Sequence, residues 1–174
     1  MTPLVEEAAK HGARSATIFT AGFDEAEGAD AAKLTARLRE TIARTGLAVS
    51  GPNCLGNLAA PSKLMTMTDN RSHDMLPGPV AIIAGSGGVG TAIKRAFNDR
   101  GVGVGYLLTM GNQAGLTAAD YVCYFAHEPT VKIIACYLEA IRSPQDFLDA
   151  CRIDRKSTRL NSSHIPLSRM PSSA

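Results

Sequence analysis

The sequence has 174 residues, which is enough for one α/β domain or for two small ones. Its apolar runs are all too short to cross a bilayer, and the acidic start Met1–Glu7 lacks the features of a signal peptide. The net charge of +2 arises in residues 153–174, which carry four basic residues and one acidic residue. Residues 1–152 have a net charge of −1, so we expect a cytoplasmic protein that binds neither nucleic acid nor a membrane.

The four cysteines form no C-x-x-C pair and have no metal-ligand spacing, so the sequence predicts free thiols and no metal site. Cys123 and Cys136 lie in apolar patterns that are typical of packing residues. Cys54 differs because it belongs to a Gly-Pro-Asn-Cys loop.

Residues 1–152 alternate between helical and strand patterns. Apolar residues at Leu34, Leu38 and Ile42 share one face of a helix that Gly46 ends. We predict helices over residues 3–11, 31–45, 91–100, 118–126 and 144–152, and strands over 16–20, 47–49, 80–84, 102–109 and 131–138. Apolar strands that are each followed by a helix indicate a parallel sheet covered on both faces.

The composition changes after Arg152, where a serine-rich segment begins that has neither helical nor strand periodicity. This composition is typical of a disordered tail. The segment 153–174 also resembles a translated adapter or vector sequence, so we interpret it as foreign to the protein.

A glycine-rich turn, Gly85-Ser86-Gly87-Gly88-Val89-Gly90, joins the predicted strand 80–84 to a helix. Glycines let the backbone turn tightly and present its N–H groups, and the helix N-terminus adds a partial positive charge. Ser86 can add a hydroxyl donor. The natural ligand of such a turn is an anion, most often a phosphate.

The same turn matches the dinucleotide fingerprint G-x-G-x-x-G through Gly85, Gly87 and Gly90. An NAD(P)-binding Rossmann oxidoreductase needs an acidic residue at the end of the next strand. That strand ends in Thr109-Met110-Gly111-Asn112-Gln113, without an acid. The oxidoreductase stays an alternative, as does a glycine turn that serves packing alone.

Three further motifs follow predicted strands: Gly51-Pro52-Asn53-Cys54-Leu55-Gly56, Gly111-Asn112-Gln113 and Tyr137-Leu138-Glu139. In open parallel sheets, ligands bind at the carboxyl ends of the strands. A buried, unpaired carboxylate is costly. Glu139 is therefore either exposed at the strand end or paired with a functional cation or imidazole.

These motifs, with Ser86-Gly87-Gly88 between them, resemble the CoA-ligase module of NDP-forming acyl-CoA synthetases, which are relatives of the succinyl-CoA synthetase alpha subunit. Thr20-Ala21-Gly22-Phe23-Asp24-Glu25 resembles the end of the family's CoA-binding domain. The resemblance implies an α/β fold: the end of a Rossmann-like CoA-binding domain at 1–50, then a truncated flavodoxin-like, parallel-sheet domain at 51–152.

The resemblance implies an acid–thiol ligase, such as an ADP-forming acetate–CoA ligase. It interconverts acyl-CoA, NDP and phosphate with a carboxylic acid, CoA and NTP, through acyl-phosphate and phosphohistidine intermediates. The implied cofactor of this part is CoA. ATP or ADP and Mg²⁺ are expected on an ATP-grasp domain or subunit of the parent enzyme. The expected small-molecule partners are an acyl-CoA or a short carboxylic acid, and phosphate.

By the same resemblance, Ser86, Gly87 and Gly88 hold the phosphate of the phosphohistidine, and Glu139 orients and polarises the imidazole. Asn53 and Cys54 are expected near the acyl and thioester end of the site. Gly111 and Asn112 are expected to line the same crevice.

The sequence departs from the family in two ways. Ala84 and Gly85 stand where the family commonly has a polar pair, and the phosphorylated histidine is expected downstream of Glu139, where residues 153–174 now stand. We therefore expect the 174-residue chain to be inactive by itself. The departures leave a second alternative, a CoA-binding sensor domain of an acetyltransferase-fused protein.

Overall fold

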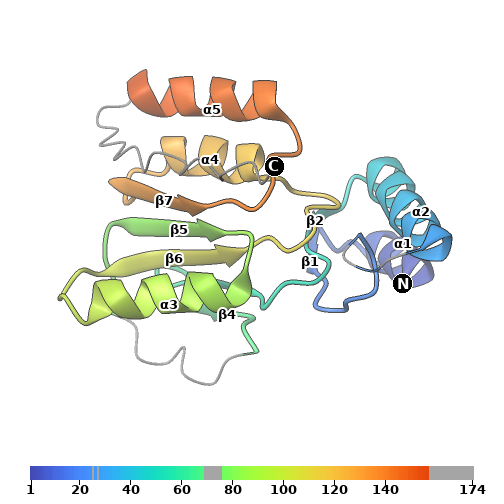
Figure 1. Ribbon diagram of the computed structural model, residues 1–174, viewed down its shortest axis with the longest axis horizontal. Coiled ribbons are helices and arrows are strands. Elements are labelled where there is room, and N and C mark those ends of the chain that lie inside the picture. The colour runs from blue at the N-terminus through green and yellow to red at the C-terminus, as the bar shows by residue number, and fades with distance from the viewer. Residues whose placement is uncertain (25, 27, 69–75, 157–174) are drawn as a thin grey trace, which may run out of the picture.

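The computed structural model describes residues 1–24, 26, 28–68 and 76–156. Two units lie side by side in it (Figure 1). A small N-terminal unit precedes a larger one that is built on a five-stranded sheet. The predicted foreign tail falls largely on residues 157–174, which lie outside the described residues.

The N-terminal unit comprises helices α1 (Thr2–Lys10) and α2 (Ala29–Thr45) and strands β1 (Ser15–Thr17) and β2 (Ala48–Ser50). The two strands pair in parallel. Gly46 ends α2 in the left-handed conformation, with φ 68°, as its position in the sequence predicts. The unit has its own hydrophobic core, formed by Val5, Ile18, Phe23, Leu38, Leu47 and Val49 together with Ala114 from the other unit.

The larger unit contains β3 (Asn57–Ala59), β4 (Leu64–Met65), β5 (Val80–Ala84), α3 (Gly87–Asn98), β6 (Val104–Thr109), α4 (Ala118–His127), β7 (Ile133–Tyr137) and α5 (Pro144–Lys156). Its strands follow the order β4-β3-β6-β5-β7. β5 is parallel to both β6 and β7, whereas β3 runs antiparallel to β6 and to β4.

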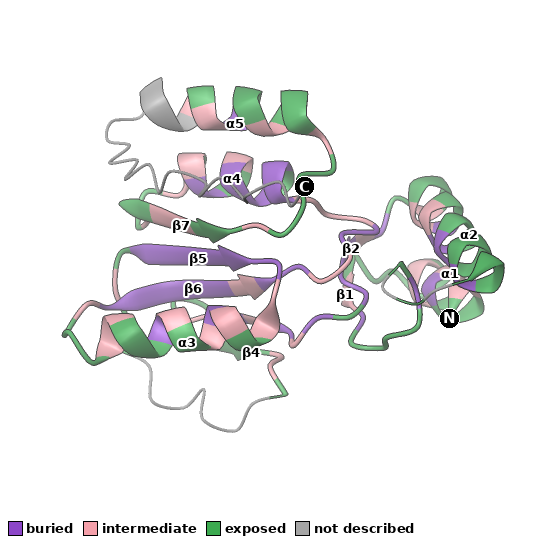
Figure 2. Ribbon diagram, viewed as in Figure 1, coloured by how far each residue is buried: buried purple, intermediate pink, exposed green. Residues whose placement is uncertain are grey.

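Helices cover both faces of this sheet because its central strands are apolar on both sides (Figure 2). Ile82 and Leu107 face α3, where Phe97 packs against the same cluster. Ala81 and Ile83 point to the opposite face, into a cluster with Val122 and Phe125 of α4. All five residues of β5 are completely buried, so this strand is the centre of the unit.

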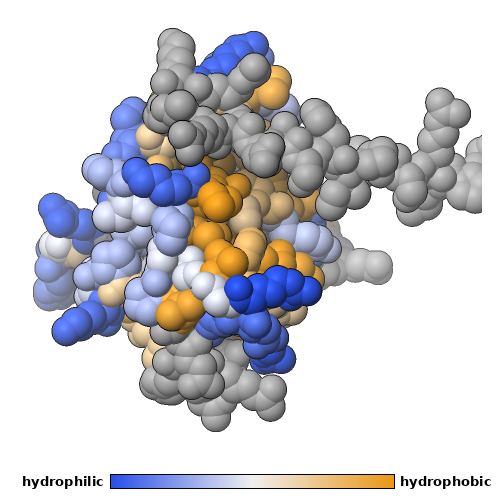
Figure 3. Space-filling model, turned by 90° about the vertical axis from the view of Figure 1, so that its left-hand side faces the viewer, coloured by the Kyte–Doolittle hydropathy of each residue, from blue (hydrophilic) through white to orange (hydrophobic). Residues whose placement is uncertain are grey.

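β7 is an edge strand and is less well covered than β5. Ile133, at its start, is 51% exposed although β7 is as apolar in sequence as the buried strands. Figure 3 looks at the end of the sheet where β5, β6 and β7 begin, and hydrophobic side chains gather in the middle of that face. The glycine turn lies at the opposite end, where β5 finishes (Figure 1).

The structure confirms the α/β fold with a parallel sheet at its centre, and it corrects two details. The hairpin β3–β4 was missed, so the sheet is mixed and not purely parallel. Its strands have three and two residues, too short for an alternating pattern to be recognised. Helix α3 begins at Gly87, four residues before the predicted start, because the glycines of the turn form its first turn.

Helix α5 continues to Lys156 and thus past Arg152, where the composition changes. The domain limits at residues 50 and 152 stay predictions. None of the helices in the described part of the chain combines the length and the apolar character needed to cross a membrane.

Candidate phosphate site

The N-terminus of α3 is shaped as an anion site. Ser86 is its N-cap, and the Ser86 Oγ accepts a hydrogen bond from the N–H of Val89 at 3.4 Å. The N–H of Gly90 donates to the Ser86 carbonyl at 2.9 Å. The N–H groups of Gly87 and Gly88 precede these and have no acceptor within the helix. With the helix dipole behind them, they can bind an anion.

Gly87 is required by its surroundings. A Cβ at this position would lie 2.3 Å from Cγ of Leu55, which packs over the start of α3. A Cβ on Gly88 would meet nothing within 4 Å, so this side of the turn is open. The turn is therefore closed by Leu55 on one side and accessible on the other.

The segment 51–56 is held against the loop that follows β6. The N–H of Asn112 donates to the Pro52 carbonyl at 2.9 Å, and Nδ2 of Asn53 donates to Oδ1 of Asn112 at 3.4 Å. Gly111 has φ 54°, and a Cβ there would lie 2.1 Å from the Pro52 oxygen. The predicted residues Asn53, Gly111 and Asn112 are thus brought together.

Cys54 belongs to the same segment but points inward. It is buried, and its Sγ–H donates to the Ile18 carbonyl at 3.4 Å. Burial raises the pKa of the Cys54 thiol above its ordinary value. Cys54 therefore packs between the two units as a thiol, and Asn53 is the exposed residue of the pair.

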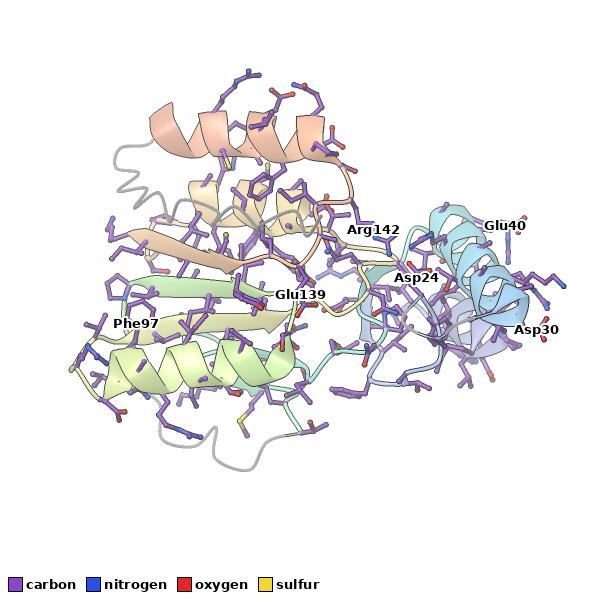
Figure 4. All side chains as sticks on the ribbon, viewed as in Figure 1. Asp24, Asp30, Glu40, Phe97, Glu139 and Arg142 are labelled. Atoms are coloured by element: carbon purple, nitrogen blue, oxygen red, sulfur yellow. The ribbon has the colours of Figure 1, made fainter. Side chains whose placement is uncertain are left out.

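Glu139 stands beside the turn, directly after β7. A Cβ on Gly85 would lie 3.4 Å from the backbone nitrogen of Glu139, so the two segments touch. The Gly85 N–H also donates to the Tyr137 carbonyl at 2.8 Å, which continues the pairing of β5 with β7. Glu139 is exposed, as the sequence allowed for a carboxylate at a strand end (Figure 4).

Four loops therefore meet at the carboxyl ends of the strands: 51–56, 85–88, 110–113 and 138–140. Contacts join neighbouring loops at Leu55 with Gly87, Pro52 with Gly111, and Gly85 with Glu139. The described residues include no group of three or more His, Cys, Asp or Glu side chains that could hold a metal ion. The chemistry that these groups support is the binding of an anion next to a carboxylate.

Residues 77–159 match the family model described as the succinyl-CoA ligase like flavodoxin domain. This segment is a succinyl-CoA ligase-like flavodoxin domain. It contains the glycine turn and Glu139, whereas the loop at 51–56 precedes the matched residues.

Curated relatives extend the likeness beyond the flavodoxin domain. The chain is 28% identical over 152 residues to the ADP-forming 4-hydroxybutyrate–CoA ligase of Nitrosopumilus maritimus, covering 87% of this chain and 22% of that protein. It is 28% identical to the alpha subunit of the ADP-forming acetate–CoA ligase I of Pyrococcus furiosus, covering 86% and 32% of the two chains. It thus spans between a fifth and a third of these relatives.

The fold is also found in a solved structure, the dinucleotide-forming acetyl-coenzyme A synthetase 1 of Ca. Korarchaeum cryptofilum in complex with phosphate and ADP. The TM-score is 0.78 and the identity 30%, over 87% of this chain and 32% of that one. The resemblance to NDP-forming acyl-CoA synthetases is confirmed by these relatives. The roles of individual residues stay predictions.

Two residues that support the site of the flavodoxin domain were not predicted. Thr109, fully buried, donates from Oγ1 to the Gly56 carbonyl at 2.7 Å and accepts from the Leu55 N–H at 3.0 Å. Gln113 donates from Nε2 to the Ala140 carbonyl at 3.2 Å and accepts from the Ala118 N–H at 3.1 Å. Gln113 is the last residue of the Gly111-Asn112-Gln113 motif, and its place in that motif is the signal that could have identified it.

Proposed function

We propose that the chain is part of an ADP-forming acyl-CoA ligase and that its own contribution is a phosphate cradle. The observation that carries the proposal is the N-terminus of α3, where Ser86, Gly87 and Gly88 present donors beside the Glu139 segment. The membership of this turn in a succinyl-CoA ligase-like flavodoxin domain supports it. The full reaction interconverts acyl-CoA, NDP and phosphate with a carboxylic acid, CoA and NTP.

In this proposal the donors of the turn stabilise the negative charge of a phosphoryl group carried by a histidine, through electrostatic preorganisation. The Glu139 carboxylate orients that imidazole and stabilises its protonated form. Asn53 and Asn112 line the crevice toward the acyl and thioester end, and CoA is the cofactor expected there. The buried Cys54 packs behind the loop that carries Asn53 and does not itself face the crevice.

The isolated chain is proposed to bind phosphate without turnover. His127 lies at the end of α4, where its Nδ1 contacts the Cys123 carbonyl, and α4 runs away from the cradle (Figure 1). His11 caps α1 in the N-terminal unit. His73 and His164 lie outside the described residues. ATP, ADP and Mg²⁺ are proposed to bind to an ATP-grasp domain or subunit of the parent enzyme. The parent enzyme is proposed to be cytoplasmic.

The experiment is a titration of the chain with inorganic phosphate, followed by amide NMR shifts. Phosphate is expected to shift the resonances of Ser86, Gly87 and Gly88. Ser86→Asp keeps an N-cap acceptor but adds a negative charge, so it should lower the affinity about tenfold without unfolding the helix. Ser62→Asp, on an exposed turn, adds the same charge elsewhere and is the matched control.

Unchanged resonances in the turn, or equal affinity for both aspartate variants, would refute the cradle. A longer chain that includes the histidine, combined with the ATP-grasp domain or subunit, should form acyl-CoA, ADP and phosphate from a carboxylic acid, CoA and ATP, and Ser86→Asp should abolish this turnover. Binding of CoA without turnover by that longer chain would instead favour the sensor alternative.

A further inference from the structure

Asp24 is bound by two arginines that come from different units. Its Oδ2 accepts a hydrogen bond from Arg39 of α2 at 2.5 Å and another from Arg142, which follows β7. Asp24 and Arg142 are 118 residues apart in sequence. The Asp24 side chain is only 25% exposed, so water screens this pair less than it would a fully exposed one.

Arg142 belongs to the same short connection as Glu139. The residues 138–143 join β7 to α5, and Glu139 precedes Arg142 by three positions. Figure 4 shows Glu139 at the carboxyl end of the sheet and Arg142 beside Asp24, between the two units. Gln113 holds Ala140 in the middle of the connection. The ion pair with Asp24 anchors the far end.

We propose that Asp24 is a positioning residue: by binding Arg142 it fixes the connection 138–143 and thereby holds Glu139 against Gly85 at the cradle. The N-terminal unit thus contributes to the phosphate site through a residue that does not touch it. The importance of Glu139 rests on the proposed function, whereas the anchoring of the connection does not.

Arg39 supplies the matched control for this proposal. It binds the same Asp24 oxygen as Arg142 but lies in α2, within the N-terminal unit. Arg39→Gln removes one partner of Asp24 and leaves the link between the units intact. Asp24→Asn and Arg142→Gln both remove the link, from opposite sides.

The test is amide hydrogen exchange and amide chemical shifts of the full 174-residue chain. Loss of a partly exposed ion pair should raise the exchange rate of residues 139–142 about two- to fivefold in Asp24→Asn and in Arg142→Gln. The Gly85 and Glu139 resonances should move in both variants. Exchange near Val104, at the start of β6, should not change, and Arg39→Gln should match the wild type throughout 139–142.

Two further variants separate positioning from a general loss of structure. The double variant Asp24→Asn/Arg142→Gln should behave like either single variant, because each already breaks the pair. Arg142→Lys keeps the charge and should retain part of the protection. Wild-type exchange in Asp24→Asn, additive effects in the double variant, or an equal effect of Arg39→Gln would each overturn the proposal. A wild-type chain that binds no phosphate would overturn the proposed function but not this anchoring.

Discussion

Glu139 lies against the backbone of Gly85: a Cβ added to Gly85 would be 3.5 Å from Cγ of Glu139 and 3.6 Å from its Cβ. A side chain on Gly85, the residue after β5, would thus be in ordinary van der Waals contact with the side chain of Glu139, which follows β7. This arrangement sets how near a negative charge stands to the donors of α3. The effect of the Glu139 charge on anion binding can therefore be tested directly.

Glu139→Gln should strengthen the binding of inorganic phosphate to the isolated chain about two- to fivefold, because a like charge near the anion is removed. In a complete enzyme that also carries the histidine and the ATP-grasp domain or subunit, the same change should slow turnover, since the imidazole loses its acidic partner. Isothermal titration and steady-state kinetics measure the two effects. Glu40→Gln on α2 removes an equal charge in the N-terminal unit and is expected to alter neither.

Gly87→Ala should destabilise the fold by about 1–3 kcal/mol, because the new methyl group would overlap with Leu55. Gly88→Ala, one residue further along α3, meets open space and should stabilise the helix by up to about 1 kcal/mol. Urea unfolding followed by circular dichroism compares the two. Equal free energies of unfolding would show that Leu55 moves aside without cost.

Cys54 should react with iodoacetamide at least about tenfold more slowly than Cys136 in the folded chain. Cys54 is buried and its thiol pKa is raised by burial, whereas Cys136 is exposed. Mass spectrometry of timed samples gives both rates in one experiment. In urea the difference should vanish, and a fast Cys54 in the folded chain would contradict its packing between the units.

The pKa of Asp24 is lowered: burial raises it, but the hydrogen bond from Arg142 and the charges of Arg39 and Arg142 outweigh burial. A carboxyl whose pKa falls on folding stabilises the protein above its unfolded pKa of about 3.9 and loses that contribution as the pH falls through the folded value. The effect should be below about 1 kcal/mol. Asp24→Asn should therefore lower the stability at pH 7 and leave it nearly unchanged at the acid end of the titration.

The sequence predicted the strands that are buried on both sides and the glycine turn between β5 and α3. Val80–Ala84 is apolar without interruption, and a glycine run after such a strand has few other interpretations. The hairpin β3–β4 was not predicted because strands of three and two residues are too short to show an alternating pattern of apolar and polar residues. Figure 2 shows that burial concentrates in β5 and β6, which are also the strands that were predicted most closely.

The supporting residues of the site could not be predicted because their partners are distant in sequence. Thr109 binds a loop 53 residues away, and Arg142 binds Asp24 across 118 residues. Neither position differs locally from an ordinary strand end or an exposed loop. Such contacts depend on the topology of the sheet, and a single sequence does not show which of its distant residues are in contact.

The connection between the two units has a consequence for cutting the protein into pieces. The carbonyls of Val49 and Gly51 accept hydrogen bonds from Leu116 and Ala114 at 2.8 and 2.9 Å, and Ala114 lies in the N-terminal core. Division after Ser50 would separate the Val49 carbonyl from the Leu116 N–H, leaving one backbone group on each piece without its partner, and would remove Ala114 from the core of the smaller piece. The two units are covalent neighbours that share an interior, so they are best expressed, labelled and crystallised together.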